Sequence, residues 1–280
     1  RSVFFRCLKC RSIFCYLPFE IAYQTYGGDP SYFKYYFEYD ACLSFMASLI
    51  MPFRSFLGNQ IRILEIGGGV GFLLKMLQLA NSKKGFYFLG LEPSLITHGK
   101  DFSLTERNLP GFFPKDLRDN KPFDLIFCSE VIEHIGDFRS FLKNISDHLS
   151  DHGVAILTTP NADAYASERA YNKFATAGYG QHLTIFSASA LELLVRELGV
   201  GHMKLCHSEG ITGKTRHIIF ISKDPEALKQ IQYKVPSDND VQLWFKDLLG
   251  AYSEEIQGHP NLPVQGREYL LLGLLARRIE

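Results

Sequence analysis

The chain has 280 residues, of which 46% are hydrophobic, and its 30 basic and 30 acidic residues give a formal net charge of zero. This size and composition are sufficient to bury a full core in one main domain with appendages. A neutral charge balance disfavours a broad nucleic-acid-binding face, which needs a basic surface. No apolar run reaches the length of about 18 residues that predicts a membrane span.

The first residue is Arg1, which predicts a fragment or a processed product, and nothing near it has the apolar middle of a signal peptide. Six cysteines are scattered along the chain, and one of them, Cys128, falls in a predicted core strand. This usage fits a reducing compartment better than a disulfide framework, so we expect a cytoplasmic protein.

Residues 1–22 contain Cys7 and Cys10 in a CxxC spacing, followed by a short apolar stretch. Such a segment is half of a zinc ribbon, because a complete site needs four ligands. Cys15 is poorly spaced to serve as a third ligand. We interpret residues 1–22 as a partial zinc-ribbon-like segment, and of the two readings the spacing favours two free cysteines over a zinc site.

Residues 23–59 are rich in tyrosine and phenylalanine, and Asp29-Pro30 predicts a helix from about Ser31, since proline suits the first turn. Tyrosine has an apolar body with a polar tip. This helix is therefore compatible both with packing on the sheet edge and with covering a ligand cleft.

A strand at Ile63–Ile66 precedes a glycine turn and a predicted helix at Phe72–Ala80. Glycines alternate along the turn, at Gly67, Gly69 and Gly71. Glycine has no Cβ, so such a turn can adopt positive φ and let a ligand lie against bare backbone. The acid before the turn, Glu65, would repel a pyrophosphate but attract a cationic or hydroxyl-bearing ligand. A turn without any ligand is the plain alternative.

The dinucleotide fingerprint is not met by these glycines. It needs a third glycine three residues after the second one, and those positions hold Phe72 and Leu74. The spacing therefore argues against NAD as the ligand.

An apolar run over residues 85–91 predicts a second buried parallel strand, which ends in Glu92-Pro93. A carboxylate offers only acceptors, so Glu92 suits hydrogen bonding to the two hydroxyls of a ribose. A solvated strand end is the alternative for this acid.

The remaining elements alternate in type, which predicts a parallel sheet with right-handed crossovers. We expect a strand at Asp124–Cys128 with a short helical turn after it, a helix at Phe138–Leu149, a polar turn at 150–153 and a strand at Val154–Thr159. Ser189 and Glu192 form a predicted capping box for a helix at Ala190–Leu198. An antiparallel pair, Met203–Ser208 and His217–Ser222, closes the sheet.

Residues 223–280 contain no motif and predict helices at about Val241–Ile256 and Gly266–Ile279. We expect this helical C-terminal extension to pack on the main domain. A homodimer formed through it is the alternative that remains open.

Three motifs follow one another along the chain. They are the acid-and-glycine turn, the strand end at Glu92, and the segment from Pro122 to Ile135 with the letters SEVIEHI. Together they resemble class I S-adenosylmethionine-dependent methyltransferases, among them the quinone-biosynthesis O-methyltransferases. The resemblance covers residues 60–222. It implies an α/β Rossmann-like fold with a seven-stranded, mostly parallel sheet, helices on both faces and an N-terminal helical lid at 23–59.

The resemblance also implies which residues hold S-adenosylmethionine. Glu65 and the three glycines would cradle the amino-acid end, and Glu92 would bind the ribose. Asp116 and Leu117 fall where the family places residues beside the adenine, and Ser129 and Glu130 complete the set.

Candidate catalytic residues follow the strands at the expected substrate side, where open α/β sheets bind ligands. A neutral imidazole can take a proton near pH 7, so His134 and His182 are candidate bases, with Glu133 beside them. Such bases would lose activity below about pH 6.5. A divalent cation held by Glu130, Glu133, His134 and His182 is one alternative, and a purely structural role is another. We favour a base or substrate-orienting role and assign no metal.

The predicted function is methyl transfer from S-adenosylmethionine to a small molecule, at a hydroxyl or carbon centre of a sugar, quinone or related metabolite. The alternatives are 2′-O-methylation of RNA, which the neutral charge disfavours, and a binding module without turnover. The acceptor itself is not specified by the sequence.

Overall fold

The computed structural model describes residues 3–16, 49, 60–81, 85–99, 103–165, 182–207 and 216–233, and part of the segment 237–250. The predicted lid at 23–59, apart from Leu49 and Gln60 at its boundary, lies outside the described residues, as does the predicted helix at Gly266–Ile279. Leu49 is helical and almost fully buried, and it belongs to one of the two main core clusters.

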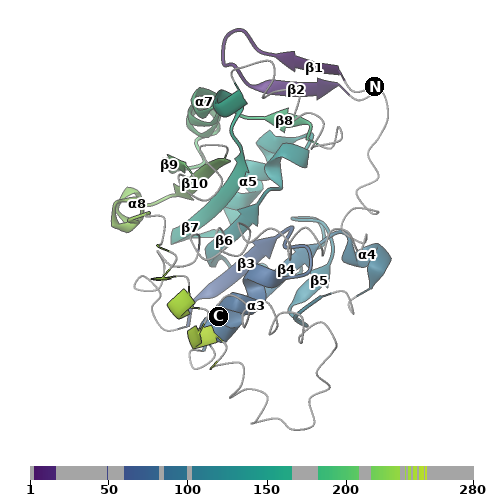
Figure 1. Cartoon of the computed structure of the whole chain (residues 1–280), viewed down its shortest axis with the longest axis vertical. Helices are drawn as coiled ribbons and strands as arrows, with labels where there is room; N and C mark the ends of the chain where they lie inside the picture. Colours follow the sequence, from purple (N-terminus) through teal and green to yellow (C-terminus); the bar gives the residue numbers. More distant parts are fainter. Residues whose placement is uncertain are drawn as a thin grey trace.

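A seven-stranded sheet forms the body of the molecule, in the order β5-β4-β3-β6-β7-β10-β9 (Figure 1). Its strands in chain order are β3 (Arg62–Ile66), β4 (Tyr87–Glu92), β5 (Asn108–Pro110), β6 (Phe123–Ser129), β7 (Leu149–Pro160), β9 (His202–His207) and β10 (Arg216–Ser222). All neighbours are parallel except β10, which runs antiparallel to both β7 and β9. The predicted mostly parallel sheet with a closing antiparallel pair is confirmed.

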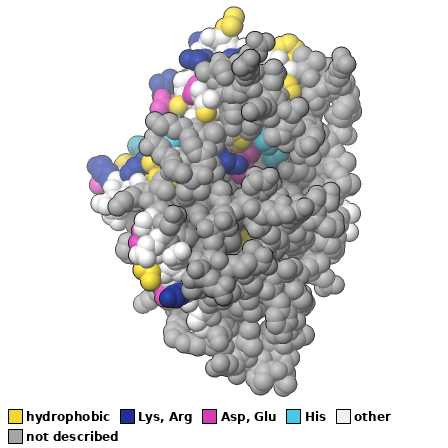
Figure 2. Space-filling view, viewed as in Figure 1, with side chains coloured by type: hydrophobic (Ala, Val, Ile, Leu, Met, Phe, Trp, Pro, Cys, Tyr) yellow, Lys and Arg dark blue, Asp and Glu magenta, His cyan; other side chains and the backbone are white. Residues whose placement is uncertain are grey.

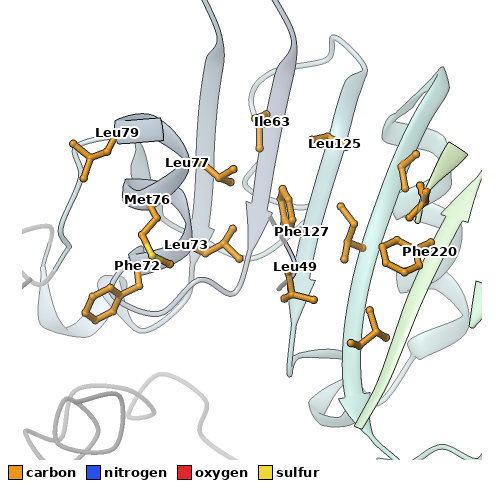
Figure 3. Packing of buried hydrophobic residues seen from close by; sticks show 14 of the residues in the cluster. Leu49, Ile63, Phe72, Leu73, Met76, Leu77, Leu79, Leu125, Phe127 and Phe220 are labelled. Carbon is orange, nitrogen blue, oxygen red and sulfur yellow. The ribbon is translucent and has the colours of Figure 1, made fainter. Parts of the chain in front are cut away.

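Helices cover both faces of this sheet, as predicted. Helices α3 (Phe72–Ala80) and α8 (Pro225–Gln230) contribute to one core cluster, and α5 (Phe138–His148) and α7 (Ala188–Leu198) contribute to the other. Figure 3 shows Leu73 and Leu77 of α3 directed toward Ile63 on the neighbouring strand. Burial of these aliphatic side chains stabilises the sheet by roughly 1.5–3 kcal/mol each.

Shorter elements lie between the main ones. They are α4 (Leu95–His98), the 3₁₀ turns η4 (Ile132–His134) and η5 (Ala162–Tyr165), and β8 (Thr184–Ile185). The turn η4 confirms the short helical turn expected after the third long strand. It follows β6 directly and therefore carries its side chains at the carboxyl edge of the sheet.

The polar turn predicted at 150–153 is wrong, because β7 already begins at Leu149. Phe123 pairs with Leu149 and Leu125 with Val154, so the register shifts between these pairs and the extra residues form an irregularity in the strand. Ser150 Oγ donates to Asp124 across the shift at 2.8 Å. Polar composition suggested a turn, but the flanking residues Leu149 and Val154 both pair with β6, and the residues between them form a bulge in the strand.

The predicted capping box of α7 is also wrong in its position. The N-cap is Ser187, whose Oγ accepts from Ala190 N–H at 3.2 Å, while Ser189 lies in the first turn. Helix α7 consequently begins at Ala188. The helix itself, with its end at Leu198, is confirmed.

The N-terminal segment forms a hairpin of β1 (Val3–Arg6) and β2 (Ile13–Tyr16). Strand β2 pairs with β8, so the hairpin and β8 make a second, three-stranded sheet, as Figure 1 shows. A small cluster of Ile13, Ala162 and Ile185 fixes the hairpin to the main domain. This part of the 1–22 segment therefore packs on the body that the seven-stranded sheet forms.

Beyond the sheet, helix α8 follows Asp224, which caps it, and Pro225 at its first position. The Asp-Pro-Glu sequence was a start signal that the sequence reasoning did not use. Farther on, Trp244 and Leu248 are each 1% exposed within the α3-side core. These two residues therefore pack on the main domain, and the packing of the extension as a whole stays a prediction. Among the described residues, no helix combines the length and apolarity needed to cross a membrane.

Candidate active site

The candidate site lies at the carboxyl edge of the parallel strands. Strand β3 pairs with β4 on one side and β6 on the other, so the chain order reverses between β3 and β6. Loops leaving such a pair of strands diverge to opposite faces, which opens a crevice at the edge of the sheet. The glycine turn after β3 and the η4 turn after β6 meet at this point.

The glycine turn has the backbone that the alternating glycines predicted. The φ angles of Gly67, Gly69 and Gly71 are 69°, 58° and 80°, all in the left-handed region. A Cβ at Gly67 would lie 2.5 Å from Val131 Cγ2, a contact that a real side chain could not make. Glycine is therefore required here both for conformation and for close approach.

Glu65 lies beneath the turn and is 5% exposed. Its carboxylate accepts from Leu74 N–H at 3.2 Å, in the first turn of α3. Burial raises the pKa of Glu65 to about 8, and the negative charge of Glu92 adds to the rise. A Cβ at Gly68 would overlap this carboxylate, so Gly68, which the sequence reasoning left aside, is needed to seat the acid.

Glu92 connects the loops that follow β3 and β4. Its two oxygens accept from Gly69 N–H and from Ser94 N–H, each at 2.8 Å. A carboxylate oxygen has a second lone pair, so both oxygens keep the capacity to accept a ligand hydroxyl. Glu92 is 8% exposed, which contradicts the alternative of a solvated strand end.

Asn108 at the start of β5 was missed by the sequence reasoning. It is fully buried, and its Nδ2 donates to Gly69 O at 3.0 Å. A Cβ at Gly90 would lie 2.6 Å from Asn108 Oδ1, so this strand glycine makes room for the amide. A glycine inside a strand is a signal of close approach and could have pointed to this contact.

Asp116 and Leu117 lie in a turn after β5, the strand next to β4. The Asp116 carboxylate accepts from Phe112 N–H at 2.8 Å and thereby closes the turn, and Leu117 packs against the α5-side core. The structure thus places both residues beyond the strand that neighbours Glu92. Their place beside the adenine stays a prediction.

Ser129 ends β6 and Glu130 follows it, and their side chains contact residues of β7 and β10. Ser129 Oγ and Thr158 Oγ1 are 2.8 Å apart. Glu130 has a φ of 56°, an uncommon value for a residue with a side chain. Its carboxylate accepts from Thr158 Oγ1 at 3.0 Å and forms an ion pair with Arg216 Nε at 2.9 Å. Thr158 and Arg216 are thus two site residues that the sequence reasoning missed.

Glu133 is fully buried, and its Oε2 accepts from Thr159 Oγ1 at 3.0 Å. Burial raises its pKa well above the ordinary value, and the charge of Glu130 adds to this effect. A neutral Glu133 is therefore favoured. The Oε1 atom is buried and makes no hydrogen bond within the described part of the chain.

His134 and His182 form an edge-to-face pair with ring centroids 4.7 Å apart. One ligand atom each from Glu133, His134 and His182 lies within 4.8 Å of the others, the only such group of three among the described residues. The pKa of His182 is lowered to about 3, chiefly by burial and also by the charges of His134 and Arg216. Figure 2 shows histidine, acidic and basic side chains gathered at one place on this face.

A pKa this low moves the expected loss of activity to lower pH if His182 is the base, and the pH dependence itself stays a prediction. A histidine buried beside a second histidine and an arginine stays neutral through the whole physiological range. A neutral imidazole can accept a proton or bind a metal ion, so both chemical alternatives remain available to it.

His182 reaches this position through backbone contacts with distant elements. Leu183 N–H donates to Glu133 O at 2.7 Å, and Cys15 N–H donates to Leu183 O at 2.9 Å. The residue next to His182 is thus held between η4 on one side and strand β2 of the N-terminal hairpin on the other. No local sequence pattern contains this arrangement.

The chain is similar in sequence to a known protein family and to curated proteins. A family model described as a methyltransferase domain matches residues 36–200, which is more than half of the chain. Among curated proteins, the ubiquinone biosynthesis O-methyltransferase of Rickettsia canadensis is 38% identical over 109 residues, covering 37% of this chain and 44% of that protein. That of Rickettsia akari is 27% identical over 109 residues, covering 37% and 41%. The chain thus spans less than half the length of these relatives.

Solved structures of other methyltransferases share the fold. The CMeT domain of the citrinin polyketide synthase superposes with a TM-score of 0.54 at 14% identity, over 70% of this chain and 58% of that one. The plantazolicin methyltransferase BpumL superposes with a TM-score of 0.51 at 16% identity, over 72% and 94%. At these identities the likeness establishes the fold alone.

Proposed function

The chain belongs to the class I S-adenosylmethionine-dependent methyltransferases, and from this premise we propose that it transfers a methyl group to a hydroxyl of a small-molecule acceptor. The assignment of a hydroxyl acceptor rests on the site residues of this chain. The whole-protein activity of the curated relatives enters only as support, because less than half of their length is matched.

The observation that carries the proposal is that two groups of residues lie at the same edge of the sheet. One is the glycine turn with its buried acids, Glu65 and Glu92, and the other is the cluster of Glu133, His134 and His182. The first fits the cofactor, because bare backbone at Gly67 and two carboxylates suit a ligand that carries an ammonium group and ribose hydroxyls. The cluster of Glu133, His134 and His182 provides groups that can accept or donate a proton.

S-adenosylmethionine, when bound, supplies an electrophilic methyl group on a positively charged sulfur. The protein has to align the acceptor for in-line attack and keep water out. A hydroxyl acceptor must also lose its proton, and neutral His182 can take it. His134, in ring contact with His182, would share that task or orient the acceptor.

A divalent cation is the competing use of the same cluster. Two imidazoles and a carboxylate are ligands that zinc and similar ions accept, and a bound cation would lower the raised pKa of Glu133. The buried oxygen of Glu133 that makes no hydrogen bond within the described residues is compatible with this use. Base catalysis remains the proposal, and a chelator distinguishes the two.

The proposed acceptor class is a phenolic or quinone-type hydroxyl. The printed names of the curated relatives, ubiquinone biosynthesis O-methyltransferases, support oxygen methylation of such a ring. A formal net charge of zero disfavours RNA, whose phosphates call for a basic surface. We therefore place a sugar hydroxyl or a carbon centre second and RNA third.

The proposal is tested by methyl transfer from isotopically labelled S-adenosylmethionine to three kinds of acceptor: catechol-type phenols, simple sugars and a short RNA. We expect label in the phenols. Label in RNA alone would overturn the small-molecule assignment. Tight binding of S-adenosylhomocysteine with no label in any acceptor would favour the binding module without turnover.

Alanine variants of His134 and His182 test the catalytic part. Removal of a general base typically lowers the rate by about 100- to 10,000-fold, whereas the affinity for S-adenosylhomocysteine should stay the same, since neither residue belongs to the glycine turn. His152→Ala is the matched control, because its side chain is 85% exposed and pairs with Asp224. Wild-type activity that is abolished by a chelator and restored by a divalent ion would instead establish the metal alternative. Full activity in both variants would leave the cluster with a structural role.

A further inference from the structure

The turn between β1 and β2 is folded around the sulfur atom of Cys7. Cys10 N–H donates to Cys7 Sγ at 3.4 Å, and Arg11 N–H donates to Cys7 O at 2.8 Å. Cys7 N–H in turn donates to Ser12 O at 2.8 Å, which closes the base of the turn. Arg11 has a φ of 63°, so the chain bends back toward Cys7 in the left-handed region. Both cysteine sulfurs therefore belong to one preformed turn.

The two side chains of this turn have the chemistry that a metal site requires. The thiolate is the form of cysteine that binds metal ions. Cys7 and Cys10 are also both free thiols, with no disulfide between them.

The turn is not built as a piece of hydrophobic core. Leu8, between the two cysteines, is 99% exposed, and Lys9 beside it is exposed as well. The turn is nevertheless held firmly at its other end, because Ser187 Oγ donates to Cys10 O. In Figure 1 the turn projects from the end of the molecule, away from the seven-stranded sheet. Apolar burial therefore does not explain why two cysteines occupy this tip.

We propose that Cys7 and Cys10 supply two of the four ligands of a structural zinc ion at the tip of the hairpin. Two thiolates at a C-x₂-C spacing are the usual contribution of one turn to a tetrahedral zinc site. No third His, Cys, Asp or Glu joins them among the described residues. A tetrahedral zinc site therefore needs two further ligands besides these cysteines.

The site has a consequence for the catalytic cluster. The hairpin carries Cys15, whose N–H donates to Leu183 O at 2.9 Å, next to His182. A metal ion that fixes the turn also fixes strand β2, and β2 pairs with β8 beside His182. The zinc ion would thus act as a clamp on the element that positions this histidine.

The test is the zinc content of the full chain, purified without chelator from zinc-containing medium, for wild type, the Cys7→Ser/Cys10→Ser double variant and the control Cys15→Ser. We expect about one zinc ion per chain if this chain holds all four ligands and about one per two chains if two copies share the site. Sedimentation of the protein separates these cases. The double variant should retain only background zinc, and Cys15→Ser should match wild type.

A second readout covers the case in which the double variant does not fold, as judged by circular dichroism. Chelation of the wild-type protein should raise the number of titratable thiols by about two per chain, because a bound zinc ion protects its ligands from reagents. Zinc that persists in the double variant but disappears in His134→Ala would overturn the proposal, since the ion would then lie in the catalytic cluster. Wild-type protein without zinc, with Cys7 and Cys10 reactive or joined in a disulfide, would overturn it equally.

Discussion

At the scale of single residues, the buried carboxyl groups give this site its character. Glu65 is enclosed by the glycine turn and by the start of α3, and its pKa is raised to about 8, first of all by burial. The acid is therefore mostly protonated at pH 7 while no cation lies near it. A ligand ammonium placed beside it would favour the ionised form and expel the proton.

Cofactor binding should therefore release a proton from Glu65. At pH 7 we expect on the order of one proton released for each molecule of S-adenosylhomocysteine bound, a number that falls toward zero above pH 8. Isothermal titration calorimetry in buffers of different ionisation enthalpy measures it. In Glu65→Gln the release should vanish and the affinity should drop by tenfold or so, the usual effect of losing a charged hydrogen-bond acceptor. Equal proton release in both proteins would mean that the ammonium lies elsewhere.

At the scale of elements, Ser187 joins three parts of the fold. It caps α7 by accepting from Ala190 N–H, its own N–H donates to Ser12 Oγ at 3.0 Å, and its hydroxyl donates to Cys10 O. The hairpin, β8 and α7 are thus connected through one fully buried side chain.

Ser187→Ala should consequently destabilise the protein by about 1–3 kcal/mol, because it removes a helix cap and leaves buried partners without a hydrogen bond. Urea unfolding measures the change in free energy. The control is Ser189→Ala, an exposed position two residues later, where we expect a change within about 0.5 kcal/mol. Equal effects at the two positions would contradict the assignment of Ser187 as the cap.

At the scale of the whole molecule, buried histidines make stability depend on pH. His217 is fully buried on β10, and its Nε2 lies 3.1 Å from Phe186 O. Burial lowers its pKa to about 4, with a further contribution from His207, while Phe186 O and Asp163 oppose the change. The pKa of His182 is lowered in the same direction. The folded state therefore binds fewer protons than the unfolded state between about pH 4 and 6.5.

Stability should thus fall as the pH drops from about 6.5 to about 4, and His217 alone contributes up to roughly 3 kcal/mol to this fall. His217→Gln, which keeps an N–H donor for Phe186 O, should flatten this part of the profile. His202→Gln at an exposed position of the neighbouring strand should not. Chemical denaturation at a series of pH values decides the matter, and parallel profiles for wild type and His217→Gln would refute the role of His217.

Much of the fold could be predicted because its signals are local. The alternation of apolar strands with helices predicted a parallel sheet. The apolar run before Gly67 and the helical periodicity after the turn predicted α3 at the residues where it is observed, Phe72–Ala80. The wrong details were also local in origin. The polar residues 150–153 resembled a turn but form a bulge within β7, between the paired residues Leu149 and Val154. The cap of α7 is Ser187 and not Ser189, and Ser187 also bonds the hairpin.

The sequence by itself determined the family, the glycine turn and the acids at its strand ends, because these depend on residue types at short, fixed spacings. Only the tertiary structure decided which distant groups share an environment. It placed His182 beside His134, Arg216 on Glu130 and Asn108 on the glycine turn. Burial and neighbouring charge set the proton affinities of Glu65, Glu133 and His182, and both arise only when segments far apart in the chain pack together.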